Sequence, residues 1–418
     1  YAIHKLEEQL GLAVFNVEGR KAVLTDTGAM LARRARLLLA EAAEHGVQTI
    51  PQYTQGSSLV SLNGRLRSSR SDVPKMPIWS LLALAGMDRR WKKDAAQLPP
   101  GAPWEAAQAE GWDSQTLESW ILRHVRTSTA RDFARVVARA VFCAEPRQLS
   151  YLYFLEYLRQ GGGLETLIGT RGGAQQDKFR GGAWQIPERM AQRLGEALRL
   201  NCPVQAVEQE AEAVRVHTPQ GAFEAKRLII AIPPTLAGRI RYNAPLPADR
   251  DGLMQRMPMG SVIKIHVAYP KPFWRARGLN GAVAANDRPF NVVFDQSPDS
   301  AEIGILVGFI DGANAVRLSP LSPQERRRIV TADLVHYFGP EAAEPLDYAE
   351  QDWTQEEWSR GCYVGLMSPG VLSTYGPALR APCGRIHWAG TETATQWMGY
   401  LDGALQSGLR AAAEVLQA

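Results

Sequence analysis

The twenty residues from Arg385 to Ala404, RIHWAGTETATQWMGYLDGA, combine residue types that could bind a polarised or anionic ligand. A strand-like start leads through a Gly-Thr-Glu turn to the beginning of a helix. The free N–H groups at a helix N-terminus and the positive end of its dipole favour a phosphate or a polarised carbonyl there. Gly390 permits close backbone approach, and Thr391 and Glu392 add polar side chains. The turn is therefore a candidate ligand site, although a turn that serves packing alone would look similar.

Two aromatic residues, Trp397 and Tyr400, flank this turn, and each has a polar edge that needs a partner when buried. The helix after them is predicted over residues 399–416. Its apolar residues are expected to bury against a sheet, namely Leu401, Ala404, Leu405, Ala412 and Val415.

The elements before the turn alternate between helical and strand-like patterns. Residues 46–180 are predicted to be mostly helical, and in WDSQTLESWILRHV we expect Asp113 or Ser114 to cap a helix with an apolar stripe. Three strand-length stretches follow in residues 202–232, and SVIKIHVAYPKPFW and IGILVGFIDG predict further strands. Interleaved strands and helices indicate a layered α/β protein.

Composition excludes several classes of protein. The 418 residues suffice for two domains, and a net charge of +4 from 47 basic and 43 acidic residues gives no sign of a nucleic-acid or membrane partner. Four cysteines without CxxC spacing indicate neither a zinc site nor a disulfide framework. No signal-peptide pattern or bilayer-length apolar run is present. We therefore expect a soluble cytoplasmic protein without a bound metal.

Residues 1–45 are predicted to form two helices around a short β-wing, NVEGRKAVLTDTG. The pattern resembles part of the winged helix-turn-helix of LysR-type transcription regulators. Six basic and six acidic residues balance in this segment, whereas a DNA-binding face usually carries a basic excess. Two interpretations stay open: helices that pack on the next domain, which we favour, and a DNA-binding fragment.

Residues 46–418 resemble the flavin-dependent monoamine oxidases. The segment GRIHWAGTETATQWMGYLDGALQSGLRAAAEVL is similar to the C-terminal flavin-binding segment of that family. Four more stretches follow the order of the family: GGAQQDKFRGGAWQIPERMAQRLG, CPVQAVEQ with LIIAIPPTLAGRIRYNAPLP, RMPMGSVIKIHVAYPKPFW, and DWTQEEWSRGCYVGLMSPGV. The resemblance implies a fold of the FAD/NAD(P)-binding amine oxidase type, with an α+β substrate domain.

The resemblance also implies roles for individual residues. Lys264, in an otherwise apolar strand, would hold a water beside flavin N5. Tyr363 and Tyr400 would form two aromatic walls between which a neutral amine approaches the flavin. Gln175 and Trp353 match positions of the substrate cavity. From the residues alone, a salt-bridged lysine and two core tyrosines are the alternatives.

The cofactor would be FAD. The positions that match contacts to it are Val204, Gly390, Thr391, Glu392 and Leu401. Cys362 matches the residue that holds the flavin covalently in the mitochondrial enzymes, although a buried free cysteine is the commoner state of this residue type.

The resemblance predicts three domains. These are a regulator-like fragment (1–45), a substrate-binding domain (46–179 and 254–355) and an FAD-binding domain (180–253 and 356–418). The family's strand–GxGxxG–helix unit, which seats a pyrophosphate, has no match in this sequence. We therefore expect strands near 228–232 and 385–389 to expose edges, and FAD binding to be weak or lost.

The predicted reaction is oxidative deamination of a primary amine to an aldehyde, with release of ammonia and hydrogen peroxide. The cofactor would accept the hydride and oxygen would reoxidise it. Arylalkyl and aliphatic amines are both compatible with the motifs, and a homodimer is left open. The alternatives are a non-catalytic remnant or fusion product and, least favoured, a DNA-binding regulator.

Overall fold

The computed structural model describes residues 15–18, 21–24, 37–70 and 76–417 of the chain. The chain divides into two compact units. Unit 1 consists of Tyr1–Thr49 and Phe179–Arg199, and unit 2 of Ile50–Lys178 and Leu200–Ala418. The predicted division into three domains stays a prediction.

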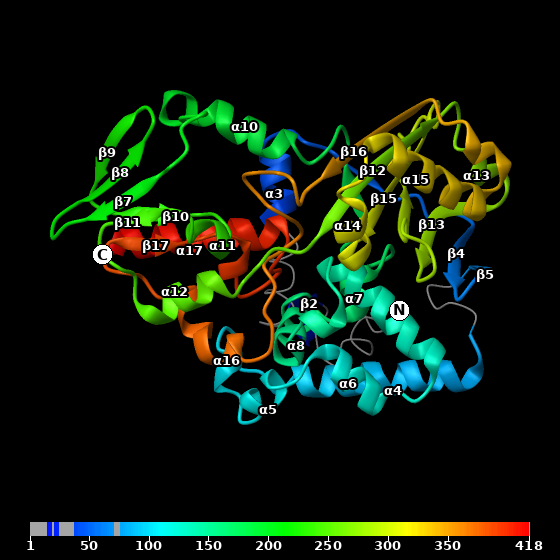
Figure 1. Cartoon of the computed structure of the whole chain (residues 1–418), viewed down its shortest axis with the longest axis horizontal. Coiled ribbons are helices and arrows are strands. Elements are labelled where there is room, and N and C mark those ends of the chain that lie inside the picture. The colour runs from blue at the N-terminus through cyan, green and yellow to red at the C-terminus, as the bar shows by residue number, and fades with distance from the viewer. Residues whose placement is uncertain (1–14, 19–20, 25–36, 71–75, 418) are drawn as a thin grey trace. The chain divides into compact units, whose positions relative to one another are not determined.

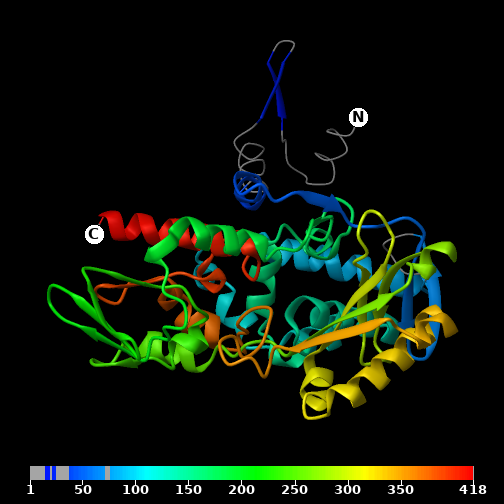
Figure 2. The same cartoon turned by 90° about the horizontal axis from the view of Figure 1, so that it is seen from above.

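The described residues of unit 1 include a hairpin and the α-helices α3 and α10. Strands β1 (Phe15–Glu18) and β2 (Lys21–Leu24) pair antiparallel, which confirms the two strands of the predicted wing (Figure 2). Helices α3 (Leu37–Glu44) and α10 (Gln185–Leu194) share a small core around Val47. The helix predicted before the wing, and the first part of the one predicted after it, lie outside the described residues.

A seven-stranded sheet forms one half of unit 2, in the order β16-β12-β15-β14-β13-β4-β5 (Figure 1). Its strands are β4 (Ser57–Leu62), β5 (Arg65–Ser69), β12 (Val262–Tyr269), β13 (Leu279–Ala285), β14 (Val292–Asp295), β15 (Gly304–Asp311) and β16 (Asp347–Asp352). The predicted strands SVIKIHV and IGILVGFID are thereby confirmed as β12 and β15.

Helices α13 (Phe273–Ala276), α14 (Gly312–Leu318) and α15 (Pro323–Phe338) cover one face of this sheet, and α15 runs along it in Figure 2. Strand β12 turns Ile263, Ile265 and Val267 toward these helices, because alternate side chains of a strand point to opposite faces. Lys264 therefore lies on the other face.

A helical region packs beside the sheet. Its helices are α4 (Ile78–Ala95), α5 (Ala109–Asp113), α6 (Leu117–His124), α7 (Ser128–Phe142), α8 (Tyr151–Gln160) and α9 (Leu164–Ile168). Helix α8 is buried on all sides, with only Arg159 partly exposed. Such a helix forms the centre of a core rather than its edge.

The predicted cap of helix α6 was wrong. The capping residue is Thr116, whose side chain accepts a hydrogen bond from the Ser119 N–H. Asp113 is instead fully buried, where it accepts from the Ser150 hydroxyl and from the backbone and hydroxyl of Ser373. The acid joins two distant segments, a role that local sequence does not reveal.

The remaining part of unit 2 contains two further sheets. Strands β11 (Arg241–Tyr242), β7 (Ala206–Gln209), β8 (Val214–Thr218) and β9 (Gly221–Ala225) form a four-stranded sheet in that order. Strands β10 (Leu228–Ile230) and β17 (Ile386–Trp388) pair in parallel, and within the described residues neither has another neighbour. Parallel strands usually belong to larger sheets that are covered on both faces. The helices here are α11 (Pro234–Ala237), α12 (Ala248–Gln255), α16 (Val371–Tyr375) and α17 (Leu401–Gln417).

Helix α17 packs through its small residues rather than its large apolar ones. Gly403, Ser407 and Ala411 are buried, whereas Leu401 is 46% exposed and Leu409 is 61% exposed. The prediction that Leu401, Ala404 and Ala412 bury against a sheet was therefore wrong. Small side chains let the helix approach β17 closely, and the Ser407 hydroxyl accepts from the Gly390 N–H at 3.0 Å.

Candidate active site

Strand β12 presents a half-buried lysine. Burial lowers the pKa of Lys264, and the neighbouring Cys362 thiol partly opposes this shift. Within the described part of the chain, no hydrogen bond or ion pair to its ammonium is present. His266 lies on the same face, and burial together with the charge of Lys264 lowers its pKa. A desolvated lysine without a carboxylate partner favours a functional role over a structural one.

A strap formed by residues 361–366 runs beside the chain that enters β12. The N–H of Cys362 donates to the Gly260 carbonyl at 2.9 Å, and the N–H of Leu366 donates to Pro258 at 2.7 Å. Burial raises the pKa of Cys362 to about 11, although the charge of Lys264 acts in the opposite direction. The strap therefore holds Cys362 as a neutral thiol close to the lysine.

Tyr363 follows in the strap and is linked to the same sheet. Its ring packs edge-on against Phe309, with the centroids 5.8 Å apart. Phe309 is the register partner of Lys264 across strands β12 and β15. Burial raises the pKa of the Tyr363 phenol well above its ordinary value, and the neighbouring Cys143 side chain acts in the same direction. Lys264 and Tyr363 are therefore both neighbours of Phe309.

Tyr400 lies next to the strap. Its ring contacts Trp397 at 5.2 Å and Tyr157 at 6.5 Å between centroids. A methyl group added at Gly399 would come within 3.3 Å of the Val364 side chain, so the segments that carry the two predicted tyrosine walls pack directly on each other. Burial raises the pKa of Tyr400 to about 12.

The Gly-Thr-Glu turn uses its polar groups inside the protein. The Gly390 N–H bonds to Ser407, and the Thr391 hydroxyl accepts from the Gly399 N–H at 2.7 Å. The Glu392 carboxylate accepts from the Gly365 N–H at 3.1 Å, and burial raises its pKa. Contact of these residues with FAD stays a prediction.

The other predicted residues lie in different surroundings. The backbone N–H of Trp353 donates to the Val262 carbonyl, which places Trp353 beside the start of β12. Gln175 is exposed and donates to the Leu167 carbonyl, and in the described residues it forms no hydrogen bond with either tyrosine. Val204 is 40% exposed, as expected for a residue that could receive a ligand.

Sequence reasoning missed the contribution of helix α8. The Tyr153 hydroxyl donates to the Gly365 carbonyl at 2.7 Å, Tyr157 contacts Tyr400, and Gln160 accepts from the backbone of Met398. The run YLYFLEYLRQ carried a signal, because a helix with aromatic and aliphatic residues on every face must be central to the fold.

The carboxyl ends of β10 and β17 form an edge that fits a dinucleotide cofactor. Ligands of parallel sheets bind at such edges, and helix α17 begins nearby. Gly390 has a φ of +103° and room beside it, since a methyl group there would meet no atom nearer than the Ile232 carbonyl at 3.6 Å. Ile232 is 38% exposed at the same edge. The residues present therefore fit the cofactor part of the prediction.

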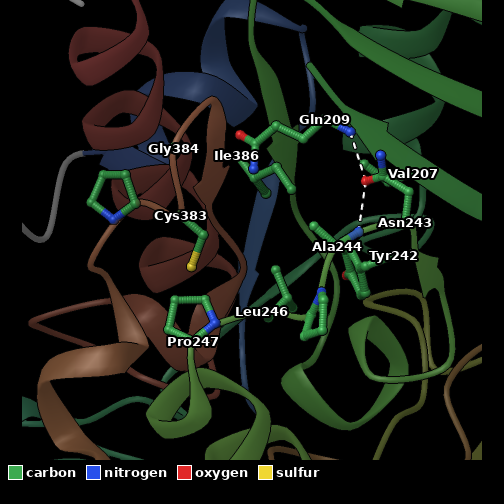
Figure 3. Close-up of a pocket in the computed structure, with 12 residues that line it drawn as sticks. Val207, Gln209, Tyr242, Asn243, Ala244, Leu246, Pro247, Cys383, Gly384 and Ile386 are labelled. Carbon is green, nitrogen blue, oxygen red and sulfur yellow. Dashed lines mark hydrogen bonds between the residues drawn. The ribbon is translucent and has the colours of Figure 1, made fainter. Parts of the chain in front are cut away.

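A separate pocket lies between the four-stranded sheet and the turn before β17 (Figure 3). Cys383 and Pro247 line one side, and Asn243 accepts hydrogen bonds from the backbone N–H groups of Gln209 and Ala244. None of the predicted site residues lines this pocket. Over the described ranges, no group of three or more His, Cys, Asp or Glu side chains could hold a metal, and no helix is long and apolar enough to cross a membrane.

Comparison with known proteins agrees with this geometry. A family model described as flavin-containing amine oxidoreductase matches residues 13–416. The chain belongs to this flavin-containing amine oxidoreductase family, whose cofactor is FAD.

Individual relatives are similar over most of their length. The chain is 38% identical to the probable flavin-containing monoamine oxidase A of Dictyostelium discoideum, over 89% of this chain and 82% of that protein. Cyclohexylamine oxidase from Brevibacterium oxydans IH-35A superimposes with a TM-score of 0.87 at 32% identity, covering 92% and 85% of the two chains. Putrescine oxidase bound to putrescine gives a TM-score of 0.87 at 28% identity, covering 92% and 86%.

Proposed function

We propose that this chain oxidises a primary amine to an imine, which water hydrolyses to an aldehyde and ammonia while oxygen becomes hydrogen peroxide. Bound FAD would supply the two-electron chemistry by accepting a hydride from the carbon that bears the amine. The observation that supports the proposal is the packing of the segments that carry Lys264, Tyr363 and Tyr400. Phe309 is the register partner of Lys264 and contacts Tyr363, and Gly399, next to Tyr400, lies against Val364, next to Tyr363.

The two tyrosines would act as neutral walls. Burial raises the pKa of both phenols, so they stay protonated at physiological pH and carry no charge toward the substrate. Two aromatic side chains can hold an amine group and direct its carbon toward the flavin. Because burial disfavours ionised groups, we infer that the amine reacts in its neutral form.

Lys264 would position water. Its ammonium is half-buried and has donors to spare, so it can hold a water molecule in a fixed orientation. Its lowered pKa also means that the lysine gives up its charge more easily than a surface lysine does. Gln175 and Trp353 remain proposed cavity residues.

We propose an arylalkyl or aliphatic monoamine as the substrate. The walls are aromatic. Of the charged groups on this sheet face, Lys264 is positive, whereas the Asp311 carboxyl is fully buried and already accepts a hydrogen bond from Asn291. A second ammonium on the substrate would be repelled by Lys264, by a Coulomb energy of about 4 kcal/mol at 4 Å in a medium of effective dielectric constant 20. Such repulsion favours substrates such as the cyclohexylamine named for one structural relative over the putrescine named for another.

FAD would be held at the edge formed by Gly390 and Ile232, with Val204 and Leu401 exposed for further contacts. We propose that the 418 residues bind FAD weakly, since they contain no GxGxxG motif and the parallel sheet has two described strands. We also propose that the flavin is not covalent, because burial keeps Cys362 a neutral thiol and thiolates are the nucleophiles. A cytoplasmic location remains a prediction.

The decisive experiment combines a visible spectrum with a peroxide assay. Purified protein is titrated with FAD, and cyclohexylamine and putrescine are then added separately. We expect flavin absorbance in the protein fraction, release of peroxide with cyclohexylamine, and little with putrescine. Acid precipitation should leave the flavin in solution.

The variant Lys264→Met tests the role of the lysine, because it keeps the length of the side chain and removes the donor. We expect Lys264→Met to bind FAD as tightly as the unaltered chain and to lose most of its peroxide production. A protein that stays colourless at every FAD concentration would refute the oxidase proposal and support a non-catalytic remnant. The pair of strands β10 and β17 is the feature that favours this second candidate.

The resemblance of residues 1–45 to a LysR-type fragment remains a separate proposal. It predicts binding to duplex DNA that weakens as salt rises. Binding that is absent at low salt would leave the first 45 residues without a DNA-reading role.

A further inference from the structure

Two adjacent residues of the Gly-Thr-Glu turn make contacts that reach in different directions. The Thr391 hydroxyl donates to the carbonyl of Tyr400 at 3.0 Å and accepts from the N–H of Gly399 at 2.7 Å. One side chain thus binds the peptide group before Gly399 and the peptide group after Tyr400. The backbone that carries this aromatic wall is fixed to the turn through Thr391.

The next residue, Glu392, binds the backbone of the segment that carries the other wall, Tyr363. Glu392 is 2% exposed, and its carboxylate accepts from the N–H of Gly365 at 3.1 Å. The carbonyl of the same glycine accepts from the Tyr153 hydroxyl at 2.7 Å. Gly365 lies two residues after Tyr363 in the strap. Its N–H and its carbonyl are therefore both hydrogen-bonded by side chains from outside the strap.

The turn itself is rigid enough to transmit these contacts. The Gly390 carbonyl accepts from both the N–H and the hydroxyl of Thr393, and the Gly390 N–H is bound to Ser407 on helix α17. Thr391 and Glu392 therefore stand on a short helical turn that is tied at both ends.

We propose that Thr391 and Glu392 are positioning residues that fix the two tyrosine walls relative to each other, with Tyr153 bracing the Tyr363 side. The hydrogen bonds that hold the two walls are present without any ligand. Their catalytic meaning rests on the proposed oxidase function, since only then do Tyr363 and Tyr400 face a substrate. Whether these hydrogen bonds fix the positions of the two segments can be tested separately from catalysis.

The chemistry of the two side chains suits this role. A hydroxyl can donate and accept at the same time, which Thr391 does. Burial raises the pKa of Glu392, and a neutral carboxyl group still offers an oxygen to the Gly365 N–H. Substitutions that keep an acceptor should therefore preserve the contacts, and those that remove it should release one wall.

The test uses paired variants. Thr391→Val and Glu392→Leu remove the hydrogen-bonding groups at similar size, whereas Thr391→Ser and Glu392→Gln retain them. Tyr153→Phe removes the brace. Tyr337→Phe is the matched control, because the Tyr337 hydroxyl is likewise buried and donates to a backbone carbonyl, that of Phe290 at 2.9 Å, in the core of the seven-stranded sheet.

The first measurement is amide hydrogen exchange of the FAD-free protein, read by mass spectrometry over residues 362–366 and 397–400. We expect Thr391→Val to speed exchange at least tenfold in 397–400, and Glu392→Leu and Tyr153→Phe to do so in 362–366. Thr391→Ser, Glu392→Gln and Tyr337→Phe should stay within threefold of the unaltered chain in both segments.

The second measurement is steady-state kinetics of the FAD-loaded protein with cyclohexylamine. Misplaced walls should lower kcat at least tenfold in Thr391→Val and Tyr153→Phe, with the Ser and Gln variants rescued and Tyr337→Phe unchanged. If the chain forms no peroxide, the exchange measurement still decides whether these hydrogen bonds fix the positions of the two segments.

Two results would overturn the proposal. One is unchanged exchange in both segments for Thr391→Val and Tyr153→Phe, which would mean that packing alone holds the walls. The other is an equal change of amide exchange in Tyr337→Phe, which would mean that the contacts contribute to the stability of the whole protein and do not position the walls in particular. If Glu392→Leu fails to fold, Thr391→Val and Tyr153→Phe remain informative.

Discussion

Replacing Gly399 by alanine tests how tightly the strap, helix α8 and the Tyr400 segment are packed. Gly399 has a φ of +84°, a region that L-residues rarely adopt. Its added methyl carbon would lie 2.5 Å from the Tyr157 hydroxyl and 3.3 Å from the Val364 side chain. Either the backbone or the neighbouring side chains must move.

The expected loss of stability follows from three contributions. The left-handed backbone costs alanine about 1.5 kcal/mol, and overpacking in a core costs about 2 kcal/mol. Reduced entropy of the unfolded chain returns about 0.7 kcal/mol. We therefore expect Gly399→Ala to lower the free energy of unfolding by about 3 kcal/mol.

Urea unfolding of a double-mutant cycle separates these contributions. Tyr157→Phe removes the oxygen nearest to the new methyl group but leaves the φ strain in place. The double variant should therefore recover about 1–2 kcal/mol of coupling energy relative to the sum of the single variants. The Gly399→Ala variant should also show altered fluorescence, because Trp397 packs against Tyr400.

Two outcomes would refute this reasoning. A Gly399→Ala protein within about 0.5 kcal/mol of the unaltered chain, the range usual for unconstrained surface changes, would mean that the contacts are loose. Additive effects of Gly399→Ala and Tyr157→Phe would mean that the hydroxyl does not limit the site.

Three further predictions concern stability. Burial raises the pKa of Glu392, so the folded state holds this proton more tightly and its contribution to stability, complete below about pH 4.3, is lost as pH rises toward the folded pKa. The side chain of Glu392→Gln cannot titrate. In thermal unfolding, the stability of this variant relative to the unaltered chain should therefore increase between pH 4 and pH 8. A stability difference that does not change with pH would contradict this prediction. Asp113→Ala should lower the free energy of unfolding by about 3 kcal/mol or more, because it leaves several buried donors unpaired. Thr116→Ala should lower it by about 1 kcal/mol, because it removes a helix cap. If urea unfolding gave the reverse order, Asp113 rather than Thr116 would be the cap. Lysine at Leu409 and Leu416 should change stability by less than about 0.5 kcal/mol in the same assay, and a loss of 2 kcal/mol would show that these residues are packed.

Strands and their alternation could be predicted from the sequence because their signals are local. The run SVIKIHV showed one charged residue among apolar ones, and strand β12 places Lys264 on the face opposite the helices. The Gly-Thr-Glu turn was also found, since a strand, a glycine and a helix start are adjacent in the chain. Family resemblance then supplied the roles that spacing does not.

Long-range contacts were beyond such reasoning. Nothing near Asp113 indicated that its partners are Ser150 and Ser373, 37 and 260 positions away. The orientation of helix α17 was wrong for a related reason, since its leucines suggested a buried stripe but its small residues make the contact with β17. Close approach can outweigh hydrophobicity when a helix carries a glycine, a serine and an alanine at four-residue spacing.

The outward leucines of helix α17 have a practical consequence. Leu409 is 61% exposed and Leu416 is 87% exposed, on the same side as Leu401. Apolar side chains gathered on one helix face attract fluorescent dyes, detergents and other proteins. Purified samples of this chain should therefore be compared at several concentrations, and a rise in dye fluorescence should not be taken as evidence of unfolding.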